Sequence, residues 1–101
     1  MKINISGPAS QWYVEEMELQ EGSSVRFFVR YGGHSPIQSG FSLGVNLDHP
    51  VDPAASIKHE GITYFIEKND EWYFDNHDLY IDFNDKTAEP AFRYEKITAN
   101  S

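Results

Sequence analysis

Short stretches in which apolar and polar residues alternate recur along most of the chain. One of the clearest runs from Val25 to Tyr31 and another from Phe41 to Leu47, with a segment rich in turn-forming residues between them. A period of two residues is typical of a β-strand with one buried face, so these two stretches are expected to form a hairpin. The same pattern predicts strands over residues 2–6, 25–31, 41–47, 57–59, 62–67, 79–83 and 91–94.

A helical period follows the first of these strands. Four apolar residues recur there at spacings of three and four, on one face of a helix: Ala9, Trp12, Tyr13 and Met17. Ser6 is expected to cap the start of this helix, with Pro8 in its first turn, where a missing N–H costs nothing. Gly22 is the expected end.

The remaining segments are expected to be turns and loops. Residues 69–75 predict one short helical turn capped by Asn69 or Asp70, and residues 34–40 and 49–56 predict loops because they are rich in proline, glycine and serine. One helix and six or seven short strands predict a mainly β to α+β domain, a short-stranded sandwich or pseudo-barrel with the N-terminal helix packed on it. We expect residues 1–101 to form one domain.

Composition narrows the chemistry. The 101 residues include no cysteine, 16 acidic and 8 basic side chains, for a net charge of −8. Disulfide, zinc-ribbon and thiol-nucleophile chemistry is thereby excluded. Residues 1–46 carry three bases and four acids (−1), and residues 47–101 carry five bases and twelve acids (−7). This acidity argues against a nucleic-acid partner, and without a long apolar run we expect a cytoplasmic, non-membrane protein.

The histidines are the first candidates for a metal or acid–base site. Their spacing fits no known metal motif. A divalent-cation site is conceivable if the proline-containing loop folds back; it would use Asp48, His49, Asp52 and His59. No nucleophile–base pairing can be recognised, so we expect the protein not to be an enzyme.

Two aromatic residues break the alternation. Phe28 and Phe65 lie on the faces opposite the main apolar rows of their strands. If both are exposed on one face, they mark a patch for a partner or for oligomerisation.

The order of these segments resembles the HesB/IscA family of A-type iron–sulfur scaffold proteins. The resemblance rests on residues 25–35, Val-Arg-Phe-Phe-Val-Arg-Tyr-Gly-Gly-His-Ser, followed by Phe-Ser-Leu-Gly-Val at 41–45. It continues through Gly-Ile-Thr-Tyr at 61–64 and Asp-Leu-Tyr-Ile-Asp-Phe at 78–83, so it spans nearly the whole chain. The chain is most similar to the cysteine-free, HesB-like branch of YneR-type proteins.

The resemblance implies a HesB-like domain and also shows what the chain lacks. Cluster-binding members use three cysteines, one in the glycine turn and two near the C-terminus; here the first position is His34, and residues 93–101 contain no thiol. Four ligands, mainly thiolates, hold such clusters, so we expect no iron–sulfur cofactor. The leading hypothesis is a partner-binding protein linked to iron–sulfur cluster assembly. The alternative is a metal-ion or small-ligand binding module that uses His34 with acidic residues.

Overall fold

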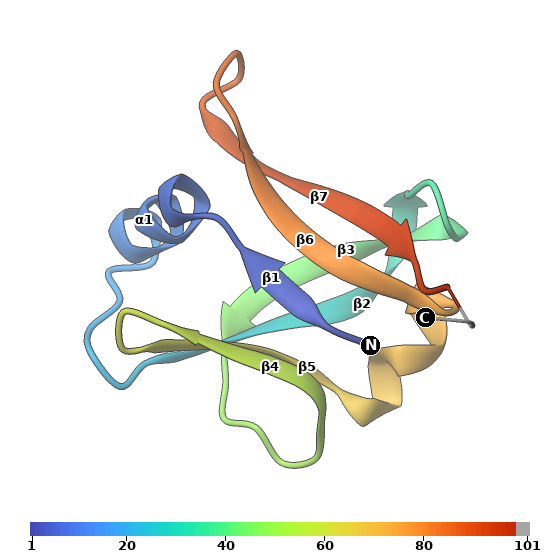
Figure 1. Cartoon of the computed structure of the whole chain (residues 1–101), viewed down its shortest axis with the longest axis horizontal. Coiled ribbons are helices and arrows are strands. Elements are labelled where there is room, and N and C mark those ends of the chain that lie inside the picture. The colour runs from blue at the N-terminus through green and yellow to red at the C-terminus, as the bar shows by residue number, and fades with distance from the viewer. Residues whose placement is uncertain (99–101) are drawn as a thin grey trace.

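The computed structural model describes residues 1–98 and contains one α-helix, one 3₁₀ helix and strands in two sheets. Figure 1 shows their arrangement. In chain order the elements are β1 (Ile3–Ile5), α1 (Gly7–Glu16), β2 (Ser24–His34), β3 (Ser39–Leu47), β4 (Pro53–His59), β5 (Ile62–Glu67), the 3₁₀ helix η1 (Lys68–Phe74), β6 (His77–Asn84) and β7 (Glu89–Lys96).

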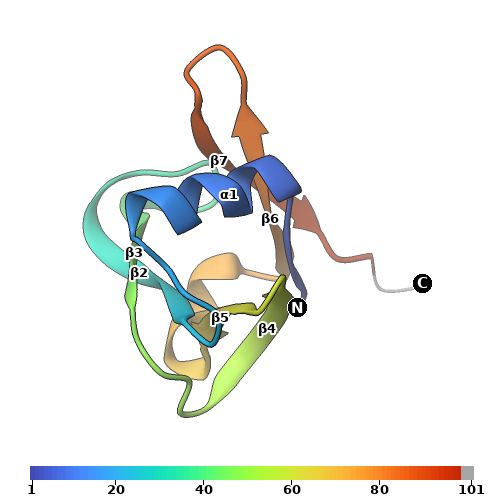
Figure 2. The same cartoon turned by 90° about the vertical axis from the view of Figure 1, so that its left-hand side faces the viewer.

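The two sheets are small and mixed. A three-stranded sheet has the order β1-β6-β7, and a four-stranded sheet has the order β3-β2-β5-β4. The pairs β1–β6 and β2–β5 are parallel, whereas the hairpins β2–β3, β4–β5 and β6–β7 are antiparallel. In Figure 2, α1 lies between the β6–β7 hairpin and the four-stranded sheet. The expected α+β architecture, with an N-terminal helix packed on short strands, is confirmed.

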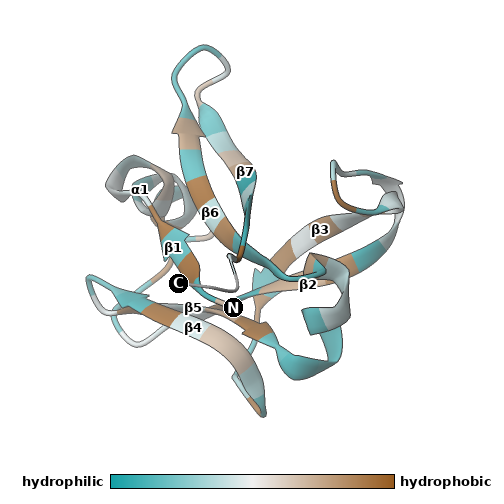
Figure 3. Ribbon diagram, turned by 45° about the vertical axis from the view of Figure 1, so that its right-hand side comes forward, coloured by the Kyte–Doolittle hydropathy of each residue, from teal (hydrophilic) through white to brown (hydrophobic). Residues whose placement is uncertain are grey.

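The core forms where the inward faces of the two sheets meet under α1. Phe27 packs edge-on against Phe92 of β7, and Tyr13 from α1 packs edge-on against Phe27. Along β6, alternating hydrophobic and hydrophilic segments are visible in Figure 3, as expected for a strand with one buried face. Buried apolar side chains from both sheets and the helix therefore make one continuous core.

The start of α1 is as predicted, but its end is not. The Ser6 side chain accepts a hydrogen bond from the backbone N–H of Ala9, and Pro8 lies in the first turn. The helix ends at Glu16, because Glu18 adopts a left-handed conformation (φ 52°) that breaks the helical path. This turn lets Leu19 reach the core, so the expected end at Gly22 is wrong.

The loop predicted over residues 49–56 is shorter than expected, because β4 begins at Pro53. Similarly, β2 extends to His34, through a bulge at Gly32 and Gly33, where positive φ angles suit glycine. The short helical turn predicted at 69–75 is present as η1.

Phe28 and Phe65 do not form an exposed patch, so that hypothesis is wrong. Phe65 is fully buried, since β5 is an interior strand with almost every residue covered on both faces. Phe28 lies over Gly44 on β3, where an added Cβ would come within 2.4 Å of its ring. A bare glycine backbone opposite an aromatic ring thus gives Phe28 its packing surface.

No helix within residues 1–98 is long and apolar enough to cross a membrane.

Candidate functional site

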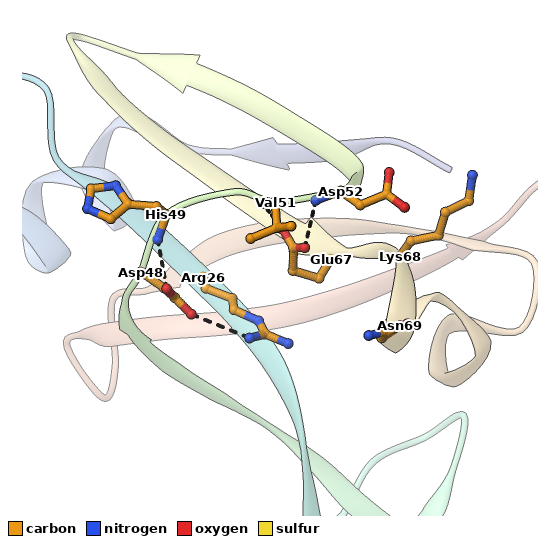
Figure 4. A pocket seen from close by; sticks show the side chains of 8 residues that line it. All are labelled: Arg26, Asp48, His49, Val51, Asp52, Glu67, Lys68 and Asn69. Atoms are coloured by element: carbon orange, nitrogen blue, oxygen red, sulfur yellow. Dashed lines mark hydrogen bonds and ion pairs between the residues drawn. The ribbon is translucent and has the colours of Figure 1, made fainter.

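A polar cleft of about 310 Å³ opens where β2 and β5 meet the loop before β4 (Figure 4). This polar cleft is lined by eight residues: Arg26, Asp48, His49, Val51, Asp52, Glu67, Lys68 and Asn69. Most of these side chains are charged. Whether the cleft is a ligand site or a structural feature depends on whether the charged groups already have partners within the protein.

Arg26 is held between two carboxylates in the polar cleft. Its guanidinium lies 3.0 Å from Asp70 Oδ2 and 3.4 Å from Asp48 Oδ2. Partial burial lowers the pKa of Arg26, but the hydrogen bonds and charges of Asp70 and Asp48 outweigh that effect and raise it overall. The cation is thereby matched within the protein and ties β2 to the β3–β4 loop and to η1.

Glu67 fixes the β3–β4 loop from the end of β5. Its two carboxylate oxygens accept hydrogen bonds from the backbone N–H groups of Val51 and Asp52, each at 2.9 Å. The carboxylate is almost buried, and both of its oxygens are used. Glu67 therefore holds the loop in place, and its carboxylate is not available to bind a ligand.

The loop residues proposed as a cation site are only partly brought together. Asp48, His49 and Asp52 line the polar cleft, but His59 stands at the other end of β4, where its Nε2 lies 3.3 Å from Glu60. Within residues 1–98 no group of three or more histidine, aspartate or glutamate side chains has a geometry suited to a metal ion. The fold-back that would have added His59 does not occur, because β4 pairs with β5 along its whole length.

A second and larger hollow lies on the opposite flank of β2. The β3 groove has a volume of about 770 Å³ and is open to solvent between α1, β3 and the start of β7. Its lining combines apolar side chains with three charged ones: Trp12, Tyr13, Glu16, Met17, Arg30, Leu43, Val45, Glu89, Pro90 and Phe92. Within residues 1–98, Glu16, Arg30 and Glu89 form no ion pair, unlike Arg26 and Asp48 of the polar cleft.

His34 lies at one end of this groove. The His34 pocket, of about 230 Å³, is lined by His34, Ser35, Pro36, Ser42, Leu43, Tyr73, Phe92 and Tyr94. Leu43 and Phe92 line both hollows, so the His34 pocket continues the β3 groove. The histidine is exposed and shares its pocket with hydroxyl groups rather than with carboxylates.

Two tyrosines form the polar floor of the His34 pocket. The hydroxyls of Tyr73 and Tyr94 are 3.0 Å apart, and burial together with this hydrogen bond raises the pKa of Tyr94 well above its usual range. Two hydroxyls carry two protons and share one bond, so one proton is left for another acceptor. The pocket can thus donate hydrogen bonds but has no acidic ligand for a cation.

These residues do not fit an iron–sulfur cluster. The donors around His34 are one imidazole and several hydroxyls, whereas clusters need thiolate ligands. The chain offers no thiol elsewhere, and the last three positions, 99–101, lie outside the described residues. Binding of a metal ion at His34 stays a prediction.

Similarity to known proteins places the chain in a group. No family model matches the sequence. A Bacillus subtilis (strain 168) protein named pyruvate dehydrogenase inhibitor is 50% identical over 95 residues, which cover 94% of this chain and 100% of that protein. The chain belongs to the family of this inhibitor. A Staphylococcus saprophyticus protein of uncharacterised function is 39% identical over 95 residues, 91% of this chain and 97% of its own length.

A solved structure supports the fold. Escherichia coli SufA, which is involved in the biosynthesis of iron–sulfur clusters, superposes with a TM-score of 0.59 over 99% of this chain and 85% of SufA. The sequence identity is 17%, so the likeness shows the HesB-like fold alone.

The most informative groups of residues were not singled out from the sequence. The sequence did not predict that Glu67 holds the loop in place. The one available signal was the position of this acidic residue directly after the mainly apolar segment 62–66. The β3 groove was also missed, because α1, β3 and β7 contribute to it from distant parts of the chain.

Proposed function

We propose that this protein is a non-enzymatic inhibitor of pyruvate dehydrogenase that acts by binding to the enzyme. The observation that carries the proposal is the 50% identity to the B. subtilis inhibitor across that protein's full length. The match also covers 94% of this chain, so the two proteins correspond over nearly their whole lengths. A pyruvate dehydrogenase partner also supports the expected location in the cytoplasm.

The distribution of surface chemistry supports a protein partner. In the polar cleft Arg26 is paired with carboxylates and Glu67 binds backbone N–H groups. The β3 groove presents apolar side chains together with Glu16, Arg30 and Glu89, which form no ion pair among residues 1–98. A mixed surface with aromatic and apolar side chains at its centre and charges at its rim is characteristic of protein–protein contacts.

The test is an inhibition assay with purified components. Pyruvate dehydrogenase complex from B. subtilis is incubated with rising concentrations of this protein, and the pyruvate-dependent formation of NADH is followed by absorbance. We expect the rate to fall and then level off near stoichiometric protein, and to recover on dilution, because binding rather than chemistry causes the inhibition.

Two controls make the assay decisive. SufA has the same fold at 17% identity and should leave the rate unchanged, whereas the B. subtilis inhibitor should lower it. An unchanged rate with this protein, in an assay where the B. subtilis inhibitor works, would refute the proposal.

The link to iron–sulfur assembly rests on the fold alone and has weaker support. The same stock of protein can be incubated anaerobically with iron and sulfide and its visible spectrum recorded. We expect no stoichiometric cluster, because the chain has no cysteine.

A further inference from the structure

The four strands at the edges of the sheets differ in how well they are protected. β1 is only three residues long, β4 begins with a proline and carries Lys58, and β7 carries Pro90 and four charged side chains. β3 is nine residues long and has neither a charge nor a proline. Figure 3 shows its middle in hydrophobic and near-neutral colours. Long, uncharged edge strands are the ones that accept another strand.

The backbone of β3 has a defined set of outward-pointing groups. The N–H of Asp48 donates to Ser24 O, and Ser24 and Asp48 face each other one step beyond the Val25–Leu47 pair. Hydrogen-bonded and non-hydrogen-bonded pairs alternate in an antiparallel ladder. Ser42, Gly44 and Asn46 therefore bond to β2, whereas the N–H and C=O groups of Leu43, Val45 and Leu47 point away from it.

The inward row of β3 side chains faces a continuous contact surface. Leu43 and Val45 line the β3 groove, into which alternate side chains of an added strand would project. At the start of β3, Phe41 lies edge-on between Tyr31 and Trp72, with ring centroids 5.6 and 5.3 Å away. Tyr31 is 89% and Trp72 is 53% exposed. Exposed aromatics next to an open edge are typical of a contact with a partner.

The charges beside the groove are mainly acidic. Two exposed carboxylates, Glu16 and Glu89, line the groove. Three further exposed carboxylates lie outside the lining, at the end of α1 and in the β6–β7 turn: Glu15, Glu18 and Asp85. Arg30 and Lys86 are the bases there. This imbalance favours a basic partner segment.

We propose that the free edge of β3, with the β3 groove beside it, binds an extended segment of a partner protein whose groove-facing side chains are apolar at the centre and basic at the ends. The segment adds to the four-stranded sheet as a fifth strand. Its backbone pairs with Leu43, Val45 and Leu47. The side chains on its groove-facing side are apolar beside Leu43 and Val45 and basic beside Glu16 and Glu89.

A second copy of this chain fits the edge less well. Each copy carries a net charge of −8, and pairing β3 with β3 would bring two acidic rims together. The partner's identity rests on the proposed function, whereas the docking edge holds for any partner with this chemistry.

Hydrogen exchange measured by NMR tests the edge in the free protein. Amides of Ser42, Gly44 and Asn46 should exchange slowly and those of Val45 and Leu47 fast, at every protein concentration. Slow exchange at Val45 and Leu47 would overturn the proposal. If that protection grows with concentration, a second copy is the occupant instead.

The heptapeptide Lys-Thr-Val-Thr-Val-Thr-Lys, which as a strand has its lysines and valines on one face, tests the occupant. We expect it to bind and to slow exchange at Val45 and Leu47 at least about tenfold, as expected for new strand hydrogen bonds. The matched peptide with glutamate for lysine should not bind, nor should a lysine peptide methylated on alternate backbone nitrogens. Equal binding of the lysine and glutamate peptides would overturn the charge assignment, and binding of the methylated peptide would overturn strand addition.

Paired variants of equal charge locate the site. Glu16→Lys with Glu89→Lys should weaken binding of the lysine peptide about tenfold at low salt. Glu60→Lys with Glu71→Lys changes the net charge equally at positions that do not line the groove, and should weaken binding far less. Equal losses in the two pairs would show that overall charge, not the groove, attracts the peptide.

The same two pairs separate this proposal from the proposed function. If the wild-type protein binds the peptide at β3 but leaves pyruvate dehydrogenase uninhibited, the docking edge stands and the enzyme is not its partner. If this protein inhibits and inhibition survives unchanged in Glu16→Lys with Glu89→Lys while peptide binding is lost, the proposed function stands, and pyruvate dehydrogenase is not the partner that binds at β3.

Discussion

The polar cleft and the β3 groove lie on different flanks of the same sheet and use their polar groups in opposite ways. In the cleft, Arg26 is neutralised by two carboxylates, and both oxygens of Glu67 are occupied by backbone N–H groups. In the groove, Glu16, Arg30 and Glu89 have no ion-pair partner within residues 1–98.

Polar groups that stabilise the fold have their partners within the protein, whereas polar groups available for binding do not. Buried polar groups with a full set of partners contribute to stability, and removing one leaves its partners unsatisfied. Exposed charges beside an apolar groove contribute little to stability and remain free to meet a partner. Changes in the cleft should therefore alter unfolding, and changes in the groove should alter binding.

The largest expected effect on stability is at Glu67. Glu67→Ala leaves the N–H groups of Val51 and Asp52 without their acceptor and should lower the free energy of unfolding by about 2 kcal/mol. Glu67→Gln keeps one acceptor oxygen and should cost about half as much. Urea unfolding followed by tryptophan fluorescence measures both. If Glu67→Ala loses inhibition at a temperature where it is folded, the polar cleft takes part in binding the enzyme, which contradicts a purely structural role.

Arg26→Met should have a smaller effect. It removes the link between the β3–β4 loop and η1 while keeping an unbranched apolar chain, so we expect a loss of about 1 kcal/mol. Added salt screens the wild-type ion pairs, so the difference in the free energy of unfolding between wild type and variant should narrow as the salt concentration rises. A gap independent of salt would mean that packing rather than charge explains the loss.

Tyr94→Phe tests how a buried tyrosine of the His34 pocket makes stability depend on pH. Burial raises the pKa values of Tyr13, Tyr64 and Tyr94 above 10.0 in the folded protein, while in the unfolded chain they ionise near that value. Their contribution to stability is therefore complete below pH 10 and is lost as the pH rises above it. Tyr94→Phe lacks one of these groups, so its stability should fall less steeply in that range. If the free energies of unfolding of wild type and Tyr94→Phe fall in parallel from pH 9 to about 11.5, ionisation of Tyr94 does not explain the loss of stability.

Much of the fold could be predicted from the sequence because its signals are local. Alternation along residues 25–31 and 41–47 gave the hairpin of β2 and β3, and Ser6 with Pro8 marked the start of α1. The end of α1 was missed because Glu18 takes a left-handed conformation without a glycine's freedom. Phe65 was misassigned because alternation implies one buried face, whereas β5 is buried on both.

The candidate sites depend on contacts that no local pattern encodes. Glu67 meets Val51 only after β4 pairs with β5, and Arg26 meets Asp70 across the sheet. The β3 groove joins residues 12–17, 43–45 and 89–92, which only the sandwich brings together. His34 was found through family resemblance, and the structure adds hydroxyls rather than carboxylates around it.

Met17→Gln should change stability the least of these variants and should nevertheless weaken binding. Met17→Gln replaces an apolar side chain on the wall of the β3 groove by a polar one of similar length, and because Met17 is only partly buried the free energy of unfolding should stay within about 0.5 kcal/mol. Inhibition of pyruvate dehydrogenase should nevertheless weaken, since a partner side chain would then be buried against an unsatisfied amide. Lys68→Gln on the wall of the polar cleft is the matched control, and its inhibition curve should overlay that of the wild type. If Lys68→Gln weakens inhibition and Met17→Gln does not, the two regions have exchanged roles, and the polar cleft rather than the groove is the contact surface.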